Sequence, residues 1–117
     1  MKIGIVGSRR RDCQDLVEAL VAEFPKGTVV ISGGCKGVDT WAAEAATYQG
    51  LSVVVFTPDL PPDGSPHWEF TKAYFARNKL IAENCDVLYA FVAPDRKGGT
   101  ENTIKHAKKL GKKIEIC

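Results

Sequence analysis

Short apolar runs alternate with longer amphipathic stretches along the whole chain, and this alternation limits the fold more than any other feature. Five apolar runs are expected to be strands, at residues 2–6, 28–32, 52–56, 86–92 and 113–116. Four stretches between them are expected to be helices, at about residues 12–24, 37–48, 70–83 and 100–110. Strands that are apolar throughout are typical of a parallel sheet covered by helices on both faces. With right-handed crossovers, the pattern predicts a single Rossmann-like, doubly wound α/β domain over residues 1–117, with strand order 3-2-1-4-5.

The composition sets limits on partners and surroundings. The chain has 117 residues, 44% of them hydrophobic, which is enough for one buried core. The formal net charge of +2 is weak evidence for general nucleic-acid binding. Four cysteines without metal-ligand spacing are expected to be reduced thiols of a cytoplasmic protein. No apolar run is long enough to cross a membrane, and the residue pattern predicts neither a metal nor a cofactor.

Glycine-rich turns follow three of the expected strands. They are Gly7-Ser8-Arg9, Ser32-Gly33-Gly34-Cys35-Lys36-Gly37 and Lys97-Gly98-Gly99-Thr100. Doubly wound sheets bind ligands outside the carboxyl ends of their strands, where the strand order reverses. Glycine lets the backbone approach an anion, and the N-terminus of the following helix attracts it. The turns therefore predict either a phosphate site or tight strand-to-helix connections, and their coincidence at three strand ends favours the phosphate site. Their spacing matches neither an ATPase loop nor a dinucleotide fingerprint.

Arg77 lies where an arginine is costly unless it has an anionic partner. The helix expected around it has one apolar stripe, formed by Phe70, Ala73, Tyr74, Leu80 and Ile81, with Arg77 in the middle. A guanidinium in a packed interface needs a carboxylate or a phosphate. One hypothesis is an internal salt bridge with Asp39 or Glu101. The other is a guanidinium that faces the glycine turns and binds a ligand.

Other polar residues have two interpretations each. Asp39, in the first turn of a helix, is either a structural residue or a partner for ribose hydroxyls. Asp12 and Thr100 are expected to be N-caps. Trp68 either stacks on a base or packs in an apolar contact. Lysines cluster near the end of the chain, where cations favour a helix C-terminus; they are Lys105, Lys108, Lys109, Lys112 and Lys113.

Short motifs along the chain resemble the SLOG superfamily, named for the Smf/DprA and LOG families, and most of all its small stand-alone YspA/YpsA-like members. The motifs are Gly7-Ser8-Arg9, Ser-Gly-Gly-x-x-Gly-Val-Asp from Ser32 to Asp39, Trp68, Arg77-Asn78 and Gly99-Thr100. The resemblance implies a Rossmann-like fold. It also implies a nucleotide or nucleotide-derived ligand in the crevice that the turns predict.

Two activities of the superfamily are alternatives for this chain. LOG-type phosphoribohydrolases cleave the N-glycosidic bond of nucleoside monophosphates with an arginine and a glutamate. Arg77 is similar to that arginine, but Thr103 stands at the glutamate position, with Glu101 nearby. DprA-type proteins bind single-stranded DNA, and their Arg-Asn-Arg-Ile-Ile-Ala segment resembles residues 77–82. Here Arg9–Arg11 and the aromatic rings of Trp68 and Tyr74 would contact the strand.

The leading hypothesis is a domain that binds, and thereby senses, a small nucleotide or phosphoribosyl compound. Phosphate contacts are expected from Gly33, Gly34, Gly37, Gly99 and Thr100. Further ligand-binding candidates in or beside the three turns are Gly7, Ser8, Arg9, Ser32, Gly98 and Glu101. Arg77 and Lys36 would neutralise the phosphate. Asp39 and Asn78 would contact the ribose, and Trp68 would cover the base. The aromatic residues Phe70, Tyr74 and Phe75 leave open an association between copies of the chain.

Overall fold

The computed structural model describes all residues 1–117 and contains five strands and four helices. In chain order they are β1 (Lys2–Gly7), α1 (Gln14–Ala22), β2 (Val29–Ser32), α2 (Val38–Tyr48), β3 (Ser52–Val55), α3 (His67–Asn84), β4 (Val87–Phe91), α4 (Gly99–Lys109) and β5 (Lys113–Ile116). All strand pairs are parallel, and their order is β3-β2-β1-β4-β5. The predicted fold class and strand order are therefore confirmed.

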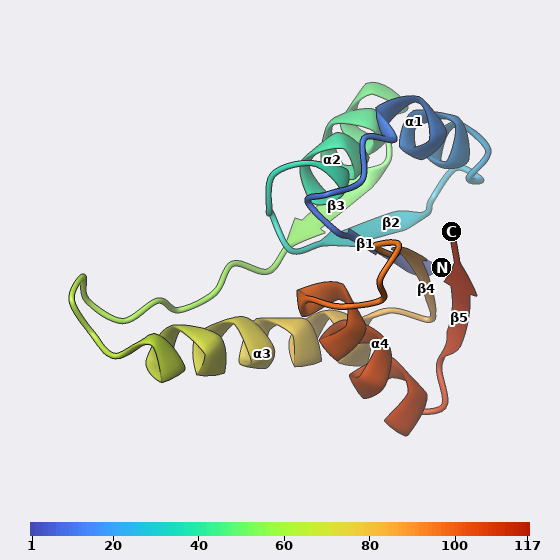
Figure 1. The fold of residues 1–117 in the computed structure, drawn as a ribbon. Coiled ribbons are helices and arrows are strands. Elements are labelled where there is room, and N and C mark those ends of the chain that lie inside the picture. Colours follow the sequence, from blue (N-terminus) through green and yellow to red (C-terminus); the bar gives the residue numbers. More distant parts are fainter.

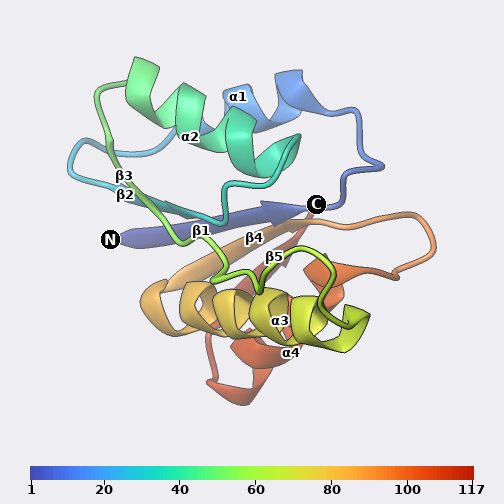
Figure 2. The same ribbon diagram turned by 90° about the vertical axis from the view of Figure 1, so that its left-hand side faces the viewer.

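The helices form two layers around the sheet. Helices α1 and α2 cover one face, and α3 and α4 cover the other (Figures 1 and 2). Because side chains alternate along a strand, β1 sends Ile3 and Ile5 into the core under α1 and α2, and Val6 into the core under α3 and α4. None of the helices is both long and apolar enough to span a bilayer.

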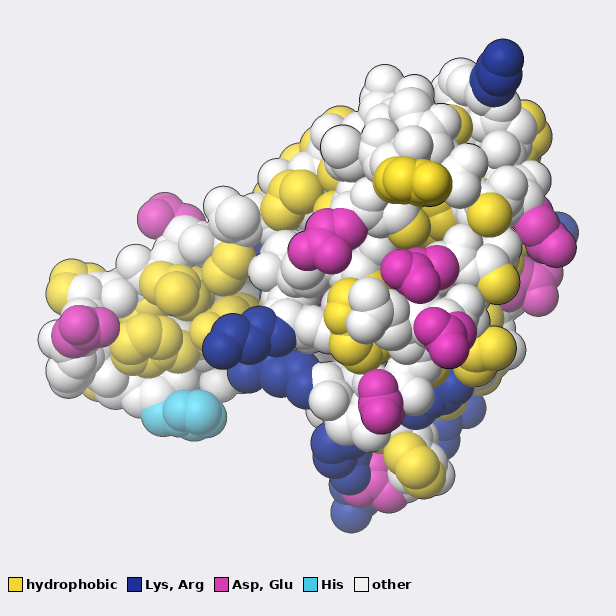
Figure 3. Space-filling view, turned by 90° about the horizontal axis from the view of Figure 1, so that it is seen from above, with side chains coloured by type: hydrophobic (Ala, Val, Ile, Leu, Met, Phe, Trp, Pro, Cys, Tyr) yellow, Lys and Arg dark blue, Asp and Glu magenta, His cyan; other side chains and the backbone are white.

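The two outer strands are less covered than the sequence predicts. Side chains of β3 and β5 are mostly exposed, including Val54, Val55 and Ile116. Coverage is incomplete because α3 does not lie along β3: its first half extends past the edge of the sheet (Figure 1). This projection, which we call the arm, consists of the loop after β3 and the start of α3, residues 57–75. Hydrophobic side chains gather on it (Figure 3).

Two predicted helix starts are wrong. Cys13, not Asp12, is the N-cap of α1, since the carbonyl of Cys13 accepts the first helical bond from Val17 N–H. Gly98 is the N-cap of α4, which places Thr100 inside the first turn. The φ angle of Gly98 is 114°, a conformation that glycine adopts without strain.

The buried face of α3 is also rotated from the predicted stripe. Its buried residues are Arg77, Asn78, Ile81 and Ala82, whereas Leu80 is 42% exposed. The rotation arises because α3 packs against α4 as well as the sheet. One consequence is that Asn78 is buried beside Arg77.

Candidate functional site

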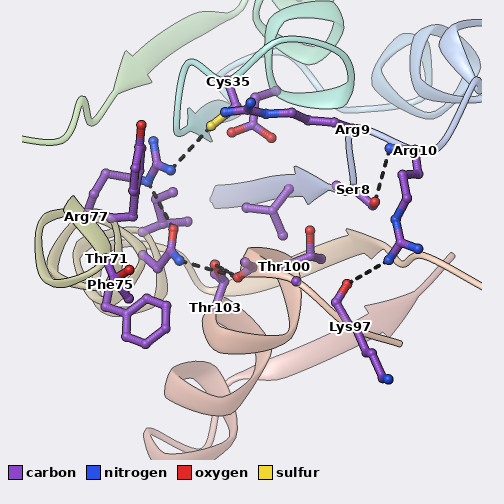
Figure 4. Close-up of a pocket in the computed structure, with 18 residues that line it drawn as sticks. Ser8, Arg9, Arg10, Cys35, Thr71, Phe75, Arg77, Lys97, Thr100 and Thr103 are labelled. Carbon is purple, nitrogen blue, oxygen red and sulfur yellow. Dashed lines mark hydrogen bonds between the residues drawn. The ribbon is translucent and has the colours of Figure 1, made fainter. Parts of the chain in front are cut away.

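A cavity of about 440 Å³ opens at the carboxyl end of β1, between α3 and the start of α4 (Figure 4). Nine of the predicted site residues line it: Gly7, Ser8, Arg9, Asp39, Arg77, Asn78, Gly98, Gly99 and Thr100. Seven others do not: Ser32, Gly33, Gly34, Lys36, Gly37, Trp68 and Glu101. The first and third glycine turns thus form the walls directly, while most of the second turn stands behind them.

The cavity also has polar and aromatic lining residues that the sequence does not assign to a small-ligand site, although Arg10 and Tyr74 are expected contacts in the single-stranded DNA alternative. They are Arg10, Cys35, Thr71, Tyr74, Phe75, Lys97 and Thr103. Thr71 and Phe75 come from α3. Because the buried face of α3 is rotated from the predicted one, both residues line the cavity (Figure 4). Thr103 occupies the position of the LOG-type glutamate, and its place in the wall could have been predicted from that alignment.

Arg77 is only 6% exposed, yet it forms no salt bridge with Asp39 or Glu101. Its Nη1 donates to the Gly33 carbonyl and its Nη2 lies 3.3 Å from Cys35 Sγ. Its Nε donates to Asn78 Oδ1 at 3.0 Å. The hypothesis of an internal salt bridge is therefore wrong. The guanidinium instead faces the turn after β2 and the cavity, with neutral partners only.

Asp39 holds the same turn from its other side. Its Oδ2 accepts a hydrogen bond from Gly33 N–H at 3.1 Å, and its own carbonyl accepts one from Ser32 Oγ at 2.9 Å. A Cβ on Gly33 would lie 2.7 Å from Asp39 Oδ2 and 2.9 Å from Arg77 Nη1. Glycine is thus required at Gly33 because the two charged side chains leave no room for a methyl group.

The Asp39 carboxyl is 4% exposed, and it is the one carboxyl group that lines the cavity. Burial raises its pKa to about 6, although the nearby Arg77 and backbone N–H groups of Cys35, Gly33 and Gly7 oppose that rise. The Asp39 carboxyl, in the wall of the cavity, therefore changes its protonation state around pH 6.

Asn78 connects the second and third glycine turns. Its Oδ1 accepts from Arg77, and its Nδ2 donates to the Gly99 carbonyl at 3.3 Å and to Asn102 Oδ1 at 3.2 Å. Both ends of the amide are therefore already used within the protein. This arrangement fixes Arg77 relative to the N-terminus of α4.

Two of the three arginines after β1 have structural partners. Arg10 binds both carboxylate oxygens of Asp95, at 2.9 and 2.6 Å, and the Lys97 carbonyl at 3.2 Å. It thereby closes one side of the cavity (Figure 4). Arg11 donates to the carbonyls of Val92 and Cys117, each at 2.9 Å. Of the three arginines, only Arg9 has a side chain without a hydrogen-bond partner in the protein.

Three of the seven predicted contacts that do not line the cavity have exposed or externally paired side chains. Glu101 pairs with Arg96 through two contacts of 2.9 and 3.0 Å. Trp68 is 62% exposed on the arm, and Lys36 is exposed beside the turn after β2. Glu101 thus faces Arg96, and Trp68 and Lys36 face solvent. The four cysteines are all free thiols, and no cluster of three or more metal-ligating side chains occurs.

Comparisons with known structures agree with this architecture. DNA processing protein A (DprA) from Streptococcus pneumoniae matches with a TM-score of 0.81 at 20% identity, over 98% of this chain and 49% of that one. The C-terminal domain of a hydrogenase from Pyrococcus furiosus matches with a TM-score of 0.54 at 13% identity, over 98% and 89%. The chain thus spans about half the length of DprA. At these identities the likeness shows a shared fold.

The sequence itself matches one family model. A comparison with curated protein sequences finds no match. The model of the YspA, cpYpsA-related SLOG family matches residues 1–61, just over half of the chain. That segment contains the turns after β1 and β2, together with Asp39, and ends before α3 begins. The chain therefore belongs to the YspA, cpYpsA-related SLOG family.

Proposed function

We propose that the protein binds a small nucleotide or phosphoribosyl compound in the cavity at the carboxyl end of β1. The observation that carries this proposal is Arg77, a buried guanidinium that has only neutral partners on the wall of an open cavity. Asp39 acts on Arg77 through space but forms no ion pair with it. Burying a cation without a directly paired counter-charge is costly, and a ligand phosphate removes that cost. A guanidinium also presents several N–H donors in one plane, which suits phosphate oxygens.

The N-terminus of α4 supports the phosphate position. The first N–H groups of a helix have no partner within it, and no side chain caps α4. Gly99 and Thr100, in the first turn, both line the cavity. The positive end of the helix therefore faces the same space as Arg77, and Asn78 holds the two together.

Hydrolysis of a nucleoside monophosphate is a second candidate, and one observation favours it. Asp39 is a carboxyl group in the cavity wall whose pKa is near 6, which suits a general base. Glu101 is less suited to that role because Arg96 pairs with it outside the cavity. This candidate predicts release of free base from a nucleoside monophosphate and its loss in Asp39→Asn, measured by chromatography.

Binding of single-stranded DNA is a third candidate, and the similarity to DNA processing protein A motivates it. Arg10 and Arg11 are engaged within the protein, which leaves Arg9 as the free cation of that cluster. Because only one arginine of the cluster is free to contact phosphates of a strand, we infer that a small ligand suits the cavity better than a long single strand.

Calorimetric titration of AMP, ADP-ribose and inorganic phosphate tests the leading proposal. We expect at least one of them to bind, and Arg77→Gln to weaken that binding by at least about tenfold, because the charged partner of the phosphate is removed. Arg96→Gln is the matched control: it removes the same charge from an arginine that does not line the cavity. Equal affinities in the two variants would refute the assignment of Arg77. A melting curve of each variant checks that the fold is retained.

A further inference from the structure

A second hollow lies beside the first, in the groove between α3 and α4. It has a volume of about 350 Å³, and its polar wall contains Lys79 from α3 and Asn102, Lys105, His106 and Lys109 from α4. We call it the α3–α4 groove. Phe75 lines both the groove and the first cavity.

The wall between the two hollows is built from side chains already described. Asn78 lines the first cavity and Asn102 lines the groove, and they share a hydrogen bond of 3.2 Å. Phe75 is 44% exposed at the same place. Phe75 and the Asn78–Asn102 pair therefore lie at the boundary between the first cavity and the groove.

The groove concentrates positive charge without pairing it. None of Lys79, Lys105 and Lys109 forms a salt bridge. Cations in the last turn of α4 are favoured by the helix dipole, which accounts for Lys109. That effect does not account for Lys79, which comes from another helix, or for Lys105, which lies before the last turn. Convergence of these ammonium groups indicates an anionic occupant.

The pKa of His106 depends on the charged groups in the groove. Partial burial lowers its pKa, and Lys79, Lys109 and Lys105 lower it further, while Glu83 on α3 acts in the opposite direction. The three lysines and Glu83 are the charged groups that face this imidazole from the two helices. An anion among the lysines would reverse their effect and favour the imidazolium.

We propose that the α3–α4 groove is a second anion site, which takes a second phosphate group of the ligand bound in the first cavity. The inference rests on the proposed function and narrows it to a nucleotide with phosphates at two separated positions, as in a dinucleotide joined by a phosphodiester. Phe75, between the sites, offers its ring face to a base. Lys79, Lys105 and Lys109 neutralise the second phosphate.

Paired charge variants test the groove. Lys79→Gln/Lys105→Gln removes one lysine of the groove from each helix. Lys72→Gln/Lys108→Gln removes one exposed lysine from each of the same helices, and neither lysine lines the first cavity or the α3–α4 groove. Both double variants therefore have the same net charge. The probes for calorimetric titration are AMP, 5′-phosphorylated diadenylate and a single strand of about ten nucleotides, which is long enough to track a charged surface.

We expect the diadenylate to bind the unchanged protein about tenfold tighter than AMP, since it reaches a second charged site. The groove variant should lose that advantage and keep its affinity for AMP, while the control variant keeps both. Equal diadenylate affinities in the two variants, with AMP still bound, would overturn the groove assignment alone. Absence of binding of AMP, ADP-ribose and inorganic phosphate alike to the unchanged protein would overturn the proposed function and this inference with it.

Two further results decide between a specific site and general attraction. Tightest binding of the longer strand, with equal losses in both double variants, would overturn the inference in favour of non-specific electrostatics. Proton NMR of the His106 ring, distinguished from His67 with His67→Gln, gives a local signal. We expect the diadenylate to raise the pKa of His106; an unchanged titration curve with the ligand bound would also overturn the inference.

Discussion

Gly33 is held from both sides by charged groups: its N–H donates to Asp39 and its carbonyl accepts from Arg77. Each charged side chain therefore has a positioning role in addition to any contact with a ligand. The turn keeps Arg77 at the cavity wall, and Asn78 keeps the same guanidinium aligned with α4. At the residue scale, the proposed phosphate site is thus formed before a ligand arrives, which lowers the cost of binding.

The buried Asp39 carboxyl predicts a pH dependence of stability. Because its folded-state pKa of about 6 exceeds its ordinary value of 3.8, its contribution favours folding at low pH and is lost as pH rises from about 4 through about 6. Asp39→Asn keeps an oxygen for Gly33 N–H but cannot ionise. Relative to the natural protein, we expect this variant to gain on the order of 3 kcal/mol in free energy of unfolding between pH 4 and pH 7.

Urea unfolding at several pH values measures that difference. Asp59→Asn, at an exposed position on the arm, is a control for the removal of one carboxyl group. A constant difference between Asp39→Asn and the natural protein across this pH range would contradict the raised pKa of Asp39.

At the scale of elements, two adjacent glycines at the start of α4 have different roles. Gly98 has a φ of 114°, and an added methyl group there is strained. Gly99 has no such conformation, and a Cβ would lie 3.9 Å from Asn78 Nδ2, an ordinary contact. The methyl group of Gly99→Ala would instead stand in the wall of the cavity, beside the N–H groups proposed to bind phosphate.

Alanine at Gly98 and alanine at Gly99 are therefore expected to have different effects, the first on stability and the second on nucleotide binding. Gly98→Ala should lower the free energy of unfolding by about 1 kcal/mol or more because of backbone strain. Gly99→Ala should leave stability equal or slightly higher, yet weaken nucleotide binding by about tenfold or more, because the approach to the helix N-terminus is narrowed. Thermal unfolding and calorimetric titration of both variants measure the two effects. Unchanged affinity in Gly99→Ala would place the phosphate elsewhere.

The sequence predicted the elements better than their ends or their faces. Periodicity identifies all five strands and four helices because burial on the sheet sets the spacing of apolar residues. It does not reveal which side of α3 meets α4, so Leu80 was assigned to the buried face and Asn78 was not recognised as buried. The starts of α1 and α4 depend on backbone angles at Cys13 and Gly98, where no side chain caps the helix.

The candidate site was predictable to a similar degree. A buried arginine within an apolar stripe and glycine turns at three strand ends are patterns of spacing, and they identify the crevice. The partners of Arg77 are a loop carbonyl and a thiol, whose positions follow from the conformation of the turn after β2. No spacing rule relates Arg10 to Asp95 or Arg96 to Glu101, because loops bring them together.

At the scale of the whole molecule, two cores share one sheet. Ile5 lies in the core under α1 and α2, and Ile81 lies in the core under α3 and α4, both almost fully buried. Strand β1 pairs with β2 on one side and β4 on the other, so neither core is complete without it. We expect the two layers to unfold together.

Ile5→Ala and Ile81→Ala should each lower the free energy of unfolding by about 2–5 kcal/mol, since each leaves a cavity in its core. Trp41 packs on the first core, so in a Trp68→Phe background its fluorescence reports that layer, and far-ultraviolet circular dichroism reports all helices. Within each variant, the fluorescence and circular dichroism signals should share one unfolding midpoint, and that midpoint should be lower than in the natural protein. Val55→Ala, at the exposed edge strand, is the control and should change stability by no more than about 0.5 kcal/mol. Separate midpoints for the two signals would contradict a single cooperative unit.

The parallel pairing of β1 has a consequence for synthesis on the ribosome. Ile3 pairs with Val30 on one side and with Val87 on the other. The first three strands can therefore assemble while the edge of β1 that will receive β4 is still bare, because β4 emerges only after β3 and the whole of α3. A bare, apolar strand edge recruits strands of other chains. Nascent chains that stall before β4 are consequently the form of this protein in greatest need of chaperone protection.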